Sequence, residues 1–156
     1  MPDKLKNGTE SKDCSIEFVT APEHLEILTE LIQYEPIFHH PEFGTTRQDF
    51  ENMTDPGFWE VGASGRRYSR EYVLTEVLKR YEDPQYRGIH SPLENTWQTQ
   101  DFHCREIARD NYLLTYTLIQ ADRVTRRSTL WQHSNTGWKI LYHQGTIVQD
   151  GDTPAA

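Results

Sequence analysis

The sequence predicts a single α+β domain in which helices come first and an antiparallel sheet follows. Three observations lead to this prediction. Leucine, isoleucine and valine recur at helical spacing over residues 25–32 and again over residues 73–81. From residue 97 onward, polar and apolar residues alternate, with many β-branched and aromatic side chains. Turn-forming residues interrupt this second half at short intervals, so neighbouring strands should pair in antiparallel fashion.

Two helices are expected in the first third of the chain. Pro22 suits a first helical position, and Pro36 should stop the helix that follows it. Thr45, with Gln48 three residues later, resembles a capping box. It predicts a short second helix that continues through Met53.

A turn, a short strand and a third helix are expected next. Residues 55–57 (Asp-Pro-Gly) should end the second helix, and residues 58–61 can form a short strand. Ser69 suits an N-cap, and the helix after it should continue to Tyr81. Residues 83–95 contain two prolines and a glycine, which is typical of a long connection.

The second half of the chain is expected to form a meander of four strands. The predicted strands are 97–107, 111–120, 123–133 and 137–148. Strict alternation places Ile140 and Tyr142 on one face of the last strand, and Leu141 and His143 on the other. Both faces of the strands are partly apolar, so we expect helices to cover one face and a second copy of the chain, in a homodimer, to cover the other. Sheet curvature alone would produce the same mixed pattern.

The composition limits the classes of protein that the sequence can encode. The chain has 156 residues, with 16 Lys and Arg against 24 Asp and Glu, a net charge of −8. This charge disfavours broad binding to the phosphate backbone of nucleic acids. No stretch approaches the roughly 20 apolar residues that cross a bilayer, and the N-terminal residues lack an apolar leader, so we expect a cytoplasmic protein without a membrane partner. Cys14 and Cys104 are too few for a disulfide framework or a cysteine-based zinc site.

Composition also suggests where the folded domain lies. Residues 16–148 are expected to form one domain, which is long enough to bury a substantial core. Residues 1–15 and 149–156 show no periodic apolar pattern, so we expect a flexible N-terminal arm and a flexible C-terminal tail.

Two parts of the sequence resemble a known family. The first is FWEVGASGRRYSRE, residues 58–71, and the second comprises RRSTLW, residues 126–131, and GWKILYHQGT, residues 137–146. Both are similar to segments of the NTF2-like superfamily, and within it to the DUF4440 or SnoaL-like type of uncharacterised bacterial protein. The likeness covers approximately residues 20–148.

The resemblance implies a cone in which N-terminal helices pack on a curved, mostly antiparallel sheet. It implies a pocket between the concave face and the helices, and pairing of two copies through the other face. The NTF2-like fold hosts isomerases, dehydratases, hydrolases and plain binding modules, so it does not by itself establish a function. The catalytic residue sets of its known enzymes do not align with this chain, which weakens the case for an enzyme.

Glu60 is the first candidate for chemistry, because it lies between two large apolar residues in the expected short strand. A carboxyl group in such surroundings is costly to bury unless it is paired or protonated. It can therefore act as a general acid or base, with Arg127, His143 or Tyr68 as its partner. The alternative is structural, either as a buried ion pair that fixes the hairpin or as an exposed side chain.

His143 is the second catalytic candidate, because an imidazole titrates near neutral pH. The alternative is a histidine that serves only the structure. Arg127, in the pair Arg126-Arg127, can face the pocket and bind a carboxylate or phosphate through two hydrogen bonds. The alternative for Arg127 is an ion pair on the surface.

The remaining ligand-binding candidates are mostly aromatic side chains that can stack on a planar ligand. They are Trp59, Tyr68, His103, Tyr116 and Trp131. Alternation along the strands forbids all of them from facing the pocket together. No metal or cofactor is expected, because the adjacent pair His39-His40 lacks ligand spacing and no nucleotide-binding glycine motif occurs.

Three functions are compatible with these observations. The leading hypothesis is a protein that binds a small organic ligand, anionic or aromatic, in a conical pocket. The second is an acid–base enzyme of the isomerase, dehydratase or hydrolase type that uses Glu60 or His143. The third is an interaction protein, such as a toxin-immunity protein, whose acidic charge attracts a basic protein partner.

Overall fold

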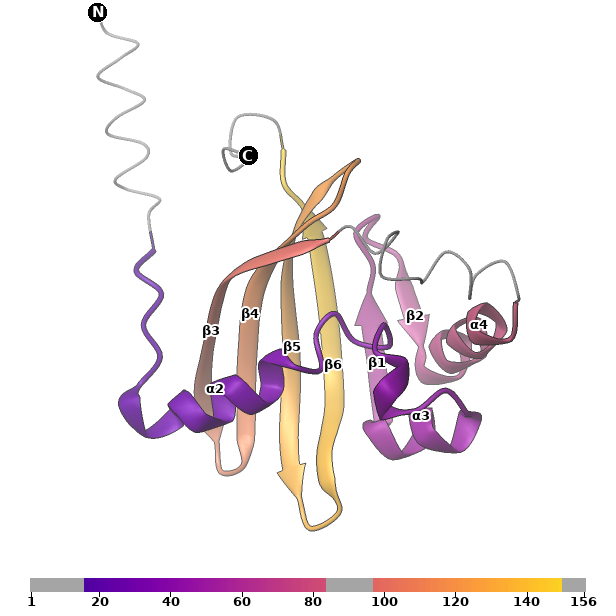
Figure 1. Ribbon diagram of the computed structural model, residues 1–156, viewed down its shortest axis with the longest axis horizontal. Helices are drawn as coiled ribbons and strands as arrows, with labels where there is room; N and C mark the ends of the chain where they lie inside the picture. Colours follow the sequence, from indigo (N-terminus) through magenta and orange to yellow (C-terminus); the bar gives the residue numbers. More distant parts are fainter. Residues whose placement is uncertain (1–15, 84–96, 150–156) are drawn as a thin grey trace, which may run out of the picture.

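A computed structural model of the chain describes residues 16–83 and 97–149 (Figure 1). The helical elements are η1 (Pro22–His24), α2 (Leu25–Ile32), η2 (Pro41–Phe43), α3 (Arg47–Met53) and α4 (Arg70–Glu82). The strands are β1 (Thr54–Val61), β2 (Arg67–Ser69), β3 (Gln98–Ala108), β4 (Asn111–Ile119), β5 (Val124–Ser134) and β6 (Gly137–Ile147). The arm predicted over residues 1–15 lies outside the described residues. So do the connection predicted over residues 83–95, apart from Asp83, and the predicted tail beyond Gln149.

The six strands form one curved sheet in the order β2-β1-β6-β5-β4-β3 (Figure 1). Neighbours are antiparallel except β1 and β6, which run parallel. The bounds of β3 to β6 confirm the four predicted strands to within one residue. Local turn chemistry explains this agreement, because Asp110 and Gly137 adopt positive φ angles of 62° and 113° between paired strands.

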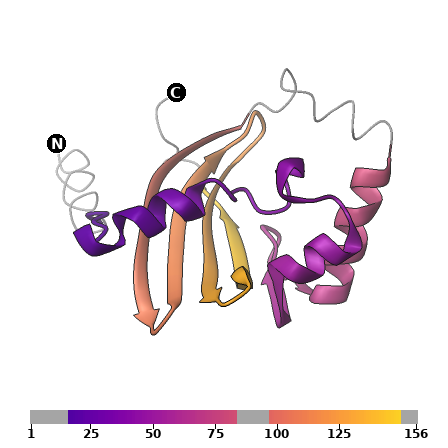
Figure 2. The ribbon, with the colours of Figure 1, turned by 60° about the horizontal axis from the view of Figure 1, so that its bottom comes forward.

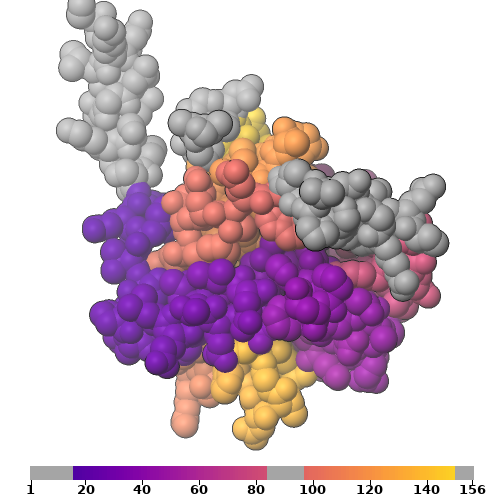
Figure 3. All heavy atoms as spheres, viewed as in Figure 1, coloured from indigo at the N-terminus to yellow at the C-terminus, as the bar shows by residue number. Residues whose placement is uncertain are grey.

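The helices cover one face of the sheet, which we call the concave face. Helix α2 packs against β3, and both α3 and α4 pack against β1 (Figure 2). In the space-filling view the chain from α2 to α3 forms a continuous belt across the middle of this face (Figure 3). The core lies beneath that belt, where Leu31, Phe50, Leu74, Leu114 and Ile140 are fully buried. The predicted α+β cone, with helices on a curved and mostly antiparallel sheet, is thereby confirmed.

The first and last helices differ in how well they were predicted. The helix expected after Pro22 is a short 3₁₀ turn followed by α2, which ends at Ile32, before Pro36 is reached. Ser69 caps α4 as predicted, since its Oγ accepts a hydrogen bond from the Tyr72 backbone N at 3.1 Å. Within residues 16–83 and 97–149, none of these helices has the length and apolar character needed to cross a membrane.

The N-terminus of α3 corrects one prediction. Its N-cap is Thr46 rather than Thr45, and the third residue of the capping box is Asp49 rather than Gln48. The Asp49 backbone N donates to Thr46 Oγ1 at 3.2 Å, and the Thr46 backbone N donates to Asp49 Oδ2 at 3.0 Å. An aspartate closes the box because its carboxylate reaches back to the N-cap as a glutamate or glutamine would.

The turn predicted over residues 55–57, between α3 and a later strand, lies inside β1 instead. Their turn chemistry is nevertheless present, since the Gly57 backbone N donates to Asp55 Oδ2 at 2.8 Å. Pairing of β1 with β6 is interrupted between Thr54 and Trp59, which is where this local turn lies. The turn therefore produces a bulge in a strand that begins at Thr54.

An irregularity in β6 overturns the predicted division of its faces. Leu130 pairs with Tyr142, whereas the next residue, Trp131, pairs with Ile140. Leu141 is thus the extra residue of a bulge, and the alternation of side chains shifts by one position there. Ile140 and His143, predicted on opposite faces, consequently both lie on the concave face and are both buried.

Candidate ligand-binding site

Two cavities lie between the helices and the concave face. The polar cavity has a volume of about 310 Å³ and lies where β1, β4 and β6 end. The apolar cavity has a volume of about 160 Å³ and lies farther along β5 and β6 toward their shared turn. Ile37 and Phe38 line both cavities. The ionisable side chains that line the polar cavity are His39, Glu60, Arg80, Arg123, Arg127 and His143.

Glu60 faces the polar cavity because of its place in β1. This strand lies between β2 and β6, so Glu60 stands opposite Tyr68 on one side and His143 on the other. Side chains that stand opposite each other on paired strands share a face of the sheet. Burial raises the pKa of Glu60, while the nearby Arg127 and Arg80 guanidinium groups oppose this rise.

His143 lies on β6 and is buried against the sheet, at 4% exposure. Its Nδ1 is 2.8 Å from Thr129 Oγ1 on β5, the residue that stands opposite it across the strand pair. Burial lowers the pKa of His143 to about 3, with further contributions from Arg127 and His39. The imidazole is therefore neutral near pH 7 and acts in hydrogen bonds rather than as a cation.

Arg127 lies at the centre of the charged groups of this cavity. Its Nε donates to Thr125 Oγ1 at 3.2 Å. The side chain crosses β6 at Gly145, where a Cβ atom would lie 3.8 Å from Arg127 Nε and 3.9 Å from its Cγ. These are ordinary van der Waals distances, so an alanine at this position would pack against the arginine. The Arg127 charge also lowers the pKa of both Glu35 and Glu60.

Two further arginines reach the same cavity from other elements. Arg80 comes from the last turn of α4, and Arg123 from the turn between β4 and β5. Arg123 is held by its own turn, since its Nε donates to Gln120 Oε1 at 3.4 Å and its backbone O accepts from the Gln120 N at 2.8 Å. Three guanidinium groups from three separate elements therefore line one cavity.

Glu35 is a buried acid that the sequence analysis missed. It follows α2 and is 4% exposed beside the concave face. Tyr116 Oη donates to its Oε1 at 2.8 Å, and Trp131 Nε1 donates to its Oε2 at 3.1 Å. Burial raises the pKa of Glu35, and hydrogen bonds from Thr129, Tyr116 and Trp131 oppose this rise. Glu35 is thus connected through Thr129 to His143 and the polar cavity.

One sequence signal could have indicated Glu35. It is a lone carboxylate in the otherwise apolar segment Tyr34–Phe38, placed beside Pro36. The same reasoning that selected Glu60, a carboxyl group among large apolar neighbours, applies to it. Its partners are 81 to 96 residues away in the sequence, so local patterns cannot identify them.

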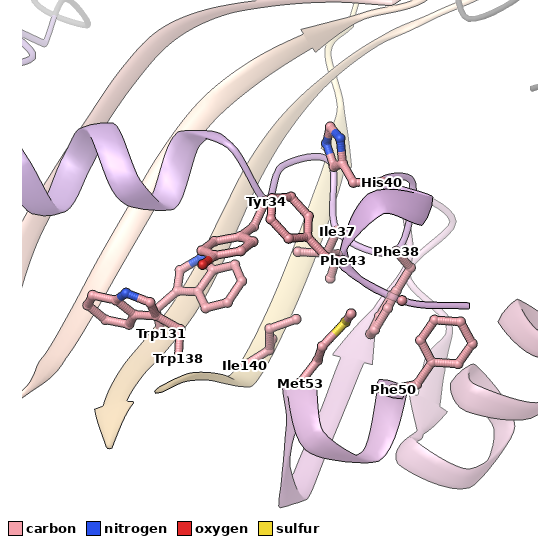
Figure 4. A pocket seen from close by; sticks show the side chains of 11 residues that line it. Tyr34, Ile37, Phe38, His40, Phe43, Phe50, Met53, Trp131, Trp138 and Ile140 are labelled. Carbon is pink, nitrogen blue, oxygen red and sulfur yellow. The ribbon is translucent and has the colours of Figure 1, made fainter. Parts of the chain in front are cut away.

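The apolar cavity is lined mainly by aromatic rings (Figure 4). Tyr34 contacts the rings of both Phe43 and Trp131, with centroid distances of 4.7 and 5.5 Å. Trp138 also lines it, and its buried Nε1 has no hydrogen-bond partner in the described part of the chain. Trp131 joins the two regions, because its ring lines the apolar cavity while its Nε1 binds Glu35.

The structure separates the sequence-predicted site residues into two groups. Tyr116, Arg127, Trp131, Glu60 and His143 lie on the concave face, within the two cavities or the hydrogen bonds that join them. The other three candidates do not line either cavity.

Trp59 lies on the outer face of the sheet, next to Tyr142, with ring centroids 4.8 Å apart and 43% exposure. His103 is also on the outer face, where its ring contacts Phe18. Tyr68 stacks on Tyr72 and lies against Gly62 at the edge of the polar cavity, without lining the cavity itself. Trp59 and His103 therefore face away from the polar cavity, because their neighbours in the strands, Glu60 and Cys104, occupy the inward positions.

The adjacent histidines 39 and 40 point to different surroundings. His39 lines the polar cavity, whereas His40 Nε2 lies 2.9 Å from the Glu35 backbone O and its Nδ1 lies 3.3 Å from Glu42 Oε1. Over residues 16–83 and 97–149, no three His, Cys, Asp or Glu side chains gather as the ligands of a metal ion would.

Comparison with solved structures establishes the fold. A protein of Caulobacter vibrioides described as having a cystatin-like fold matches 82% of this chain and 92% of its own, with a TM-score of 0.56 and 16% identity. NTF2-like proteins from Rhodospirillum rubrum and Cytophaga hutchinsonii match 80% and 83% of this chain and 98% and 100% of their own. Their TM-scores are 0.53 and 0.52, and both are 12% identical to it. The chain has the NTF2-like fold. No family model matches it, and no curated protein is significantly similar, so the DUF4440 or SnoaL-like type stays a prediction.

In this NTF2-like domain the polar cavity lies between the concave face and the helices, where the resemblance implied a pocket. Its groups have three distinct capacities. The arginines can bind an anion, and Glu60 can exchange a proton. His143, being neutral, can donate or accept a hydrogen bond.

Proposed function

We propose that this NTF2-like protein binds a small organic anion in the polar cavity. The observation that carries the proposal is that three arginine side chains line one cavity in a chain of net charge −8. Among the described lining residues, Glu60 is the one carboxylate that opposes them. Such a concentration of positive charge in an acidic protein favours a carboxylate or phosphate as the ligand group.

Arg127 is the principal anion-binding residue in this proposal. None of the ion pairs found among the described residues involves it. Its Nε is held by Thr125, and its guanidinium group also hydrogen-bonds Tyr116. A guanidinium group carries several N–H donors, so its terminal nitrogens can still form the paired hydrogen bonds that a carboxylate or phosphate accepts.

The rest of the polar cavity suits the body of such a ligand. Apolar side chains at Val73, Trp97 and Leu118 line it and can contact a hydrocarbon or aromatic group. The volume of about 310 Å³ fits a small ligand. An organic acid with a compact apolar part is therefore the ligand that this cavity favours.

A thermal-shift screen with small carboxylates and inorganic phosphate tests this function, using phenylacetate, mandelate and benzoate as the organic probes. A ligand at about 100 times its Kd stabilises the folded state by roughly 2.7 kcal/mol, which raises the Tm by several degrees. We expect this rise with at least one probe in the wild-type protein. We expect it to disappear in Arg127→Gln, with isothermal titration calorimetry confirming the loss of binding.

Arg126→Gln is the matched control. It removes the same charge from the adjacent residue of β5, but Arg126 lies on the outer face, where its Nη1 donates to Thr117 Oγ1 at 2.7 Å. Binding that survives in Arg126→Gln and is lost in Arg127→Gln supports the cavity. The proposal would be contradicted if the two variants bound the probes equally well, or if no probe bound to the wild-type protein.

Acid–base catalysis on the bound anion is the second candidate function. The observation that favours it is the pairing of Glu60 with His143 across β1 and β6 at the same cavity, with the pKa of Glu60 raised by burial. A carboxylate with a raised pKa is suited to take a proton from carbon at neutral pH.

Solvent deuterium exchange tests this second function, because it detects proton abstraction whatever reaction follows. Mandelate or phenylacetate is incubated with the protein in D₂O, and incorporation at the carbon next to the carboxylate is followed by NMR. Catalysis by Glu60 predicts incorporation with the wild-type protein and a rate at least roughly 100-fold lower in Glu60→Gln. Exchange at the uncatalysed rate would rule out proton abstraction from these acids and leave binding as the function.

A further inference from the structure

A continuous chain of hydrogen-bonding groups leads from buried Glu35 to the polar cavity. Glu35 lies beneath the concave face, and the Thr129 hydroxyl hydrogen-bonds its carboxyl group. The same hydroxyl lies 2.8 Å from His143 Nδ1. His143 in turn lines the polar cavity. Thr129 is fully buried, so its single proton must be shared between these two neighbours without help from bulk water.

The position of that proton follows from the groups around Glu35. Tyr116 Oη donates to one carboxyl oxygen and Trp131 Nε1 donates to the other. An indole N–H can only donate, so the carboxyl group is surrounded by donors, as an ionised carboxylate requires. Burial raises the pKa of Glu35, and these hydrogen bonds together with the charge of Arg127 oppose that rise. The Thr129 hydroxyl then donates to Glu35 as well, because its oxygen would otherwise face a carboxylate oxygen with no proton between them.

A threonine that donates to Glu35 has only its oxygen lone pair left for His143. The ring nitrogen that faces it, Nδ1, must therefore carry a proton. Because the imidazole is neutral, it has one N–H, and its other nitrogen, Nε2, is left with a free lone pair. No described residue hydrogen-bonds Nε2, and His143 lines the cavity, so this lone pair is available to a ligand.

We propose that Glu35, acting through Thr129, holds His143 as the Nδ1–H tautomer, so that Nε2 presents a hydrogen-bond acceptor to the polar cavity. Glu35 and Thr129 are positioning residues, whereas His143 contacts the ligand. Where the proposed function holds, this inference narrows the ligand class. The ligand is a small acid that also carries a hydroxyl or N–H group, with its anionic group at Arg127 and its donor at His143.

NMR of the ¹⁵N-labelled full-length protein tests the tautomer directly, without any ligand. Two-bond ¹H–¹⁵N correlation spectra distinguish the Nδ1–H and Nε2–H forms of a histidine, and His143→Gln identifies the signals of His143 among the seven histidines. We expect the Nδ1–H pattern near pH 7. An Nε2–H pattern, or a protonated ring, would overturn the proposal.

Two substitutions at residue 129 test the connection to Glu35. Thr129→Ser keeps the hydroxyl and should keep the Nδ1–H pattern. Thr129→Val removes it at nearly constant volume, so a proton on Nδ1 would be buried without an acceptor and should move to Nε2. Retention of the Nδ1–H form in a folded Thr129→Val protein would show that Thr129 does not set the tautomer. If that variant does not fold, the NMR spectra of the wild-type protein and of Glu35→Gln still show whether His143 is in the Nδ1–H or the Nε2–H form.

Mandelate and phenylacetate test the ligand class, since they differ only in the hydroxyl group. We expect the wild-type protein to bind mandelate roughly tenfold more tightly by calorimetry, the effect of one net hydrogen bond. The preference should be kept in Thr129→Ser and lost in Thr129→Val. Equal binding of the two acids to the wild-type protein would overturn the ligand class. If neither acid binds although the Nδ1–H form is observed, the proposed function fails and the tautomer stands.

Discussion

His143 is neutral in the folded chain because burial, Arg127 and His39 all disfavour its charged form. The folded protein therefore binds fewer protons at this residue than the unfolded chain does, from about pH 6.5 down to about pH 3. The stability that a neutral His143 provides is fully present above about pH 6.5 and is lost as the pH falls below it.

We expect the contribution of His143 to the free energy of unfolding to fall by about 2 kcal/mol between about pH 7.5 and about pH 5. Urea unfolding of the wild-type protein and of His143→Gln at both pH values measures this contribution, because glutamine does not titrate. The wild-type protein should lose about 2 kcal/mol more than the variant over this interval.

The carboxyl groups near His143 have the opposite effect on how stability changes with pH. The pKa values of Glu35 and Glu60 are raised by burial, so these groups add stability as the pH falls. Both groups are present in the two proteins, so the comparison with His143→Gln largely removes their effect. Identical pH dependence in the two proteins would show that His143 titrates normally in the folded state.

The residues of the candidate site differ in how far the sequence could reveal them. Glu60 was identifiable because its two neighbours in the chain are large and apolar, and local sequence shows this directly. The face on which Trp59 lies was not identifiable, because alternation separates two sets of side chains without saying which is inward. Glu35 could not be identified from local sequence, because the side chains that surround it, Tyr116, Thr129 and Trp131, come from distant strands.

At the scale of elements, the best-predicted features are those decided by a few adjacent residues. The bounds of β3 to β6 follow from turns such as that at Asp110, and α4 begins at its predicted cap, Ser69. The bulge at Leu141 depends on how β5 and β6 pair, which the sequence of β6 alone does not contain. The consequence for the site is large, since this bulge places both Ile140 and His143 on the concave face.

The capping box of α3 can be tested by single substitutions. Thr46→Ala removes the side chain that accepts from the Asp49 backbone N, and we expect it to lower the free energy of unfolding by about 1 kcal/mol. Thr45→Ala is the control, because the hydrogen bond of Thr45 to Asp49 comes from its backbone N and survives the change. Chemical denaturation of both variants measures the difference. A larger loss in Thr45→Ala would support the capping box expected from the sequence instead.

At the scale of the whole molecule, the outer face of the sheet is the surface through which we expect two copies to associate. It carries Trp59 at 43% exposure beside Tyr142, with no helix of the described residues over it. We predict that two copies of the chain pair through this face, as expected from the mixed character of its strands. The same patch on each copy would meet the other across a two-fold axis.

Sedimentation equilibrium tests this prediction. The wild-type protein should have a mass twice that of the 18.3 kDa chain, and Trp59→Lys should shift it toward the single chain by burying a charge in the contact. Leu25→Lys places the same charge at a residue of α2 that is 50% exposed, on the helical side, and should leave the mass unchanged. A wild-type protein that sediments as a single chain at micromolar concentration would refute the pairing.

The parallel pairing of β1 with β6 has a consequence for how the protein is made. Trp59 pairs with Tyr142, so β1 finds its partner strand only after β3, β4 and β5 have been synthesised. Until β6 is in place, β1 and β2 have no strand pairing with the antiparallel strands β3 to β5. Contacts between residues so far apart in sequence slow folding. The polar cavity, which takes Glu60 from one part and Arg127 from the other, therefore forms only when β6 joins the two halves.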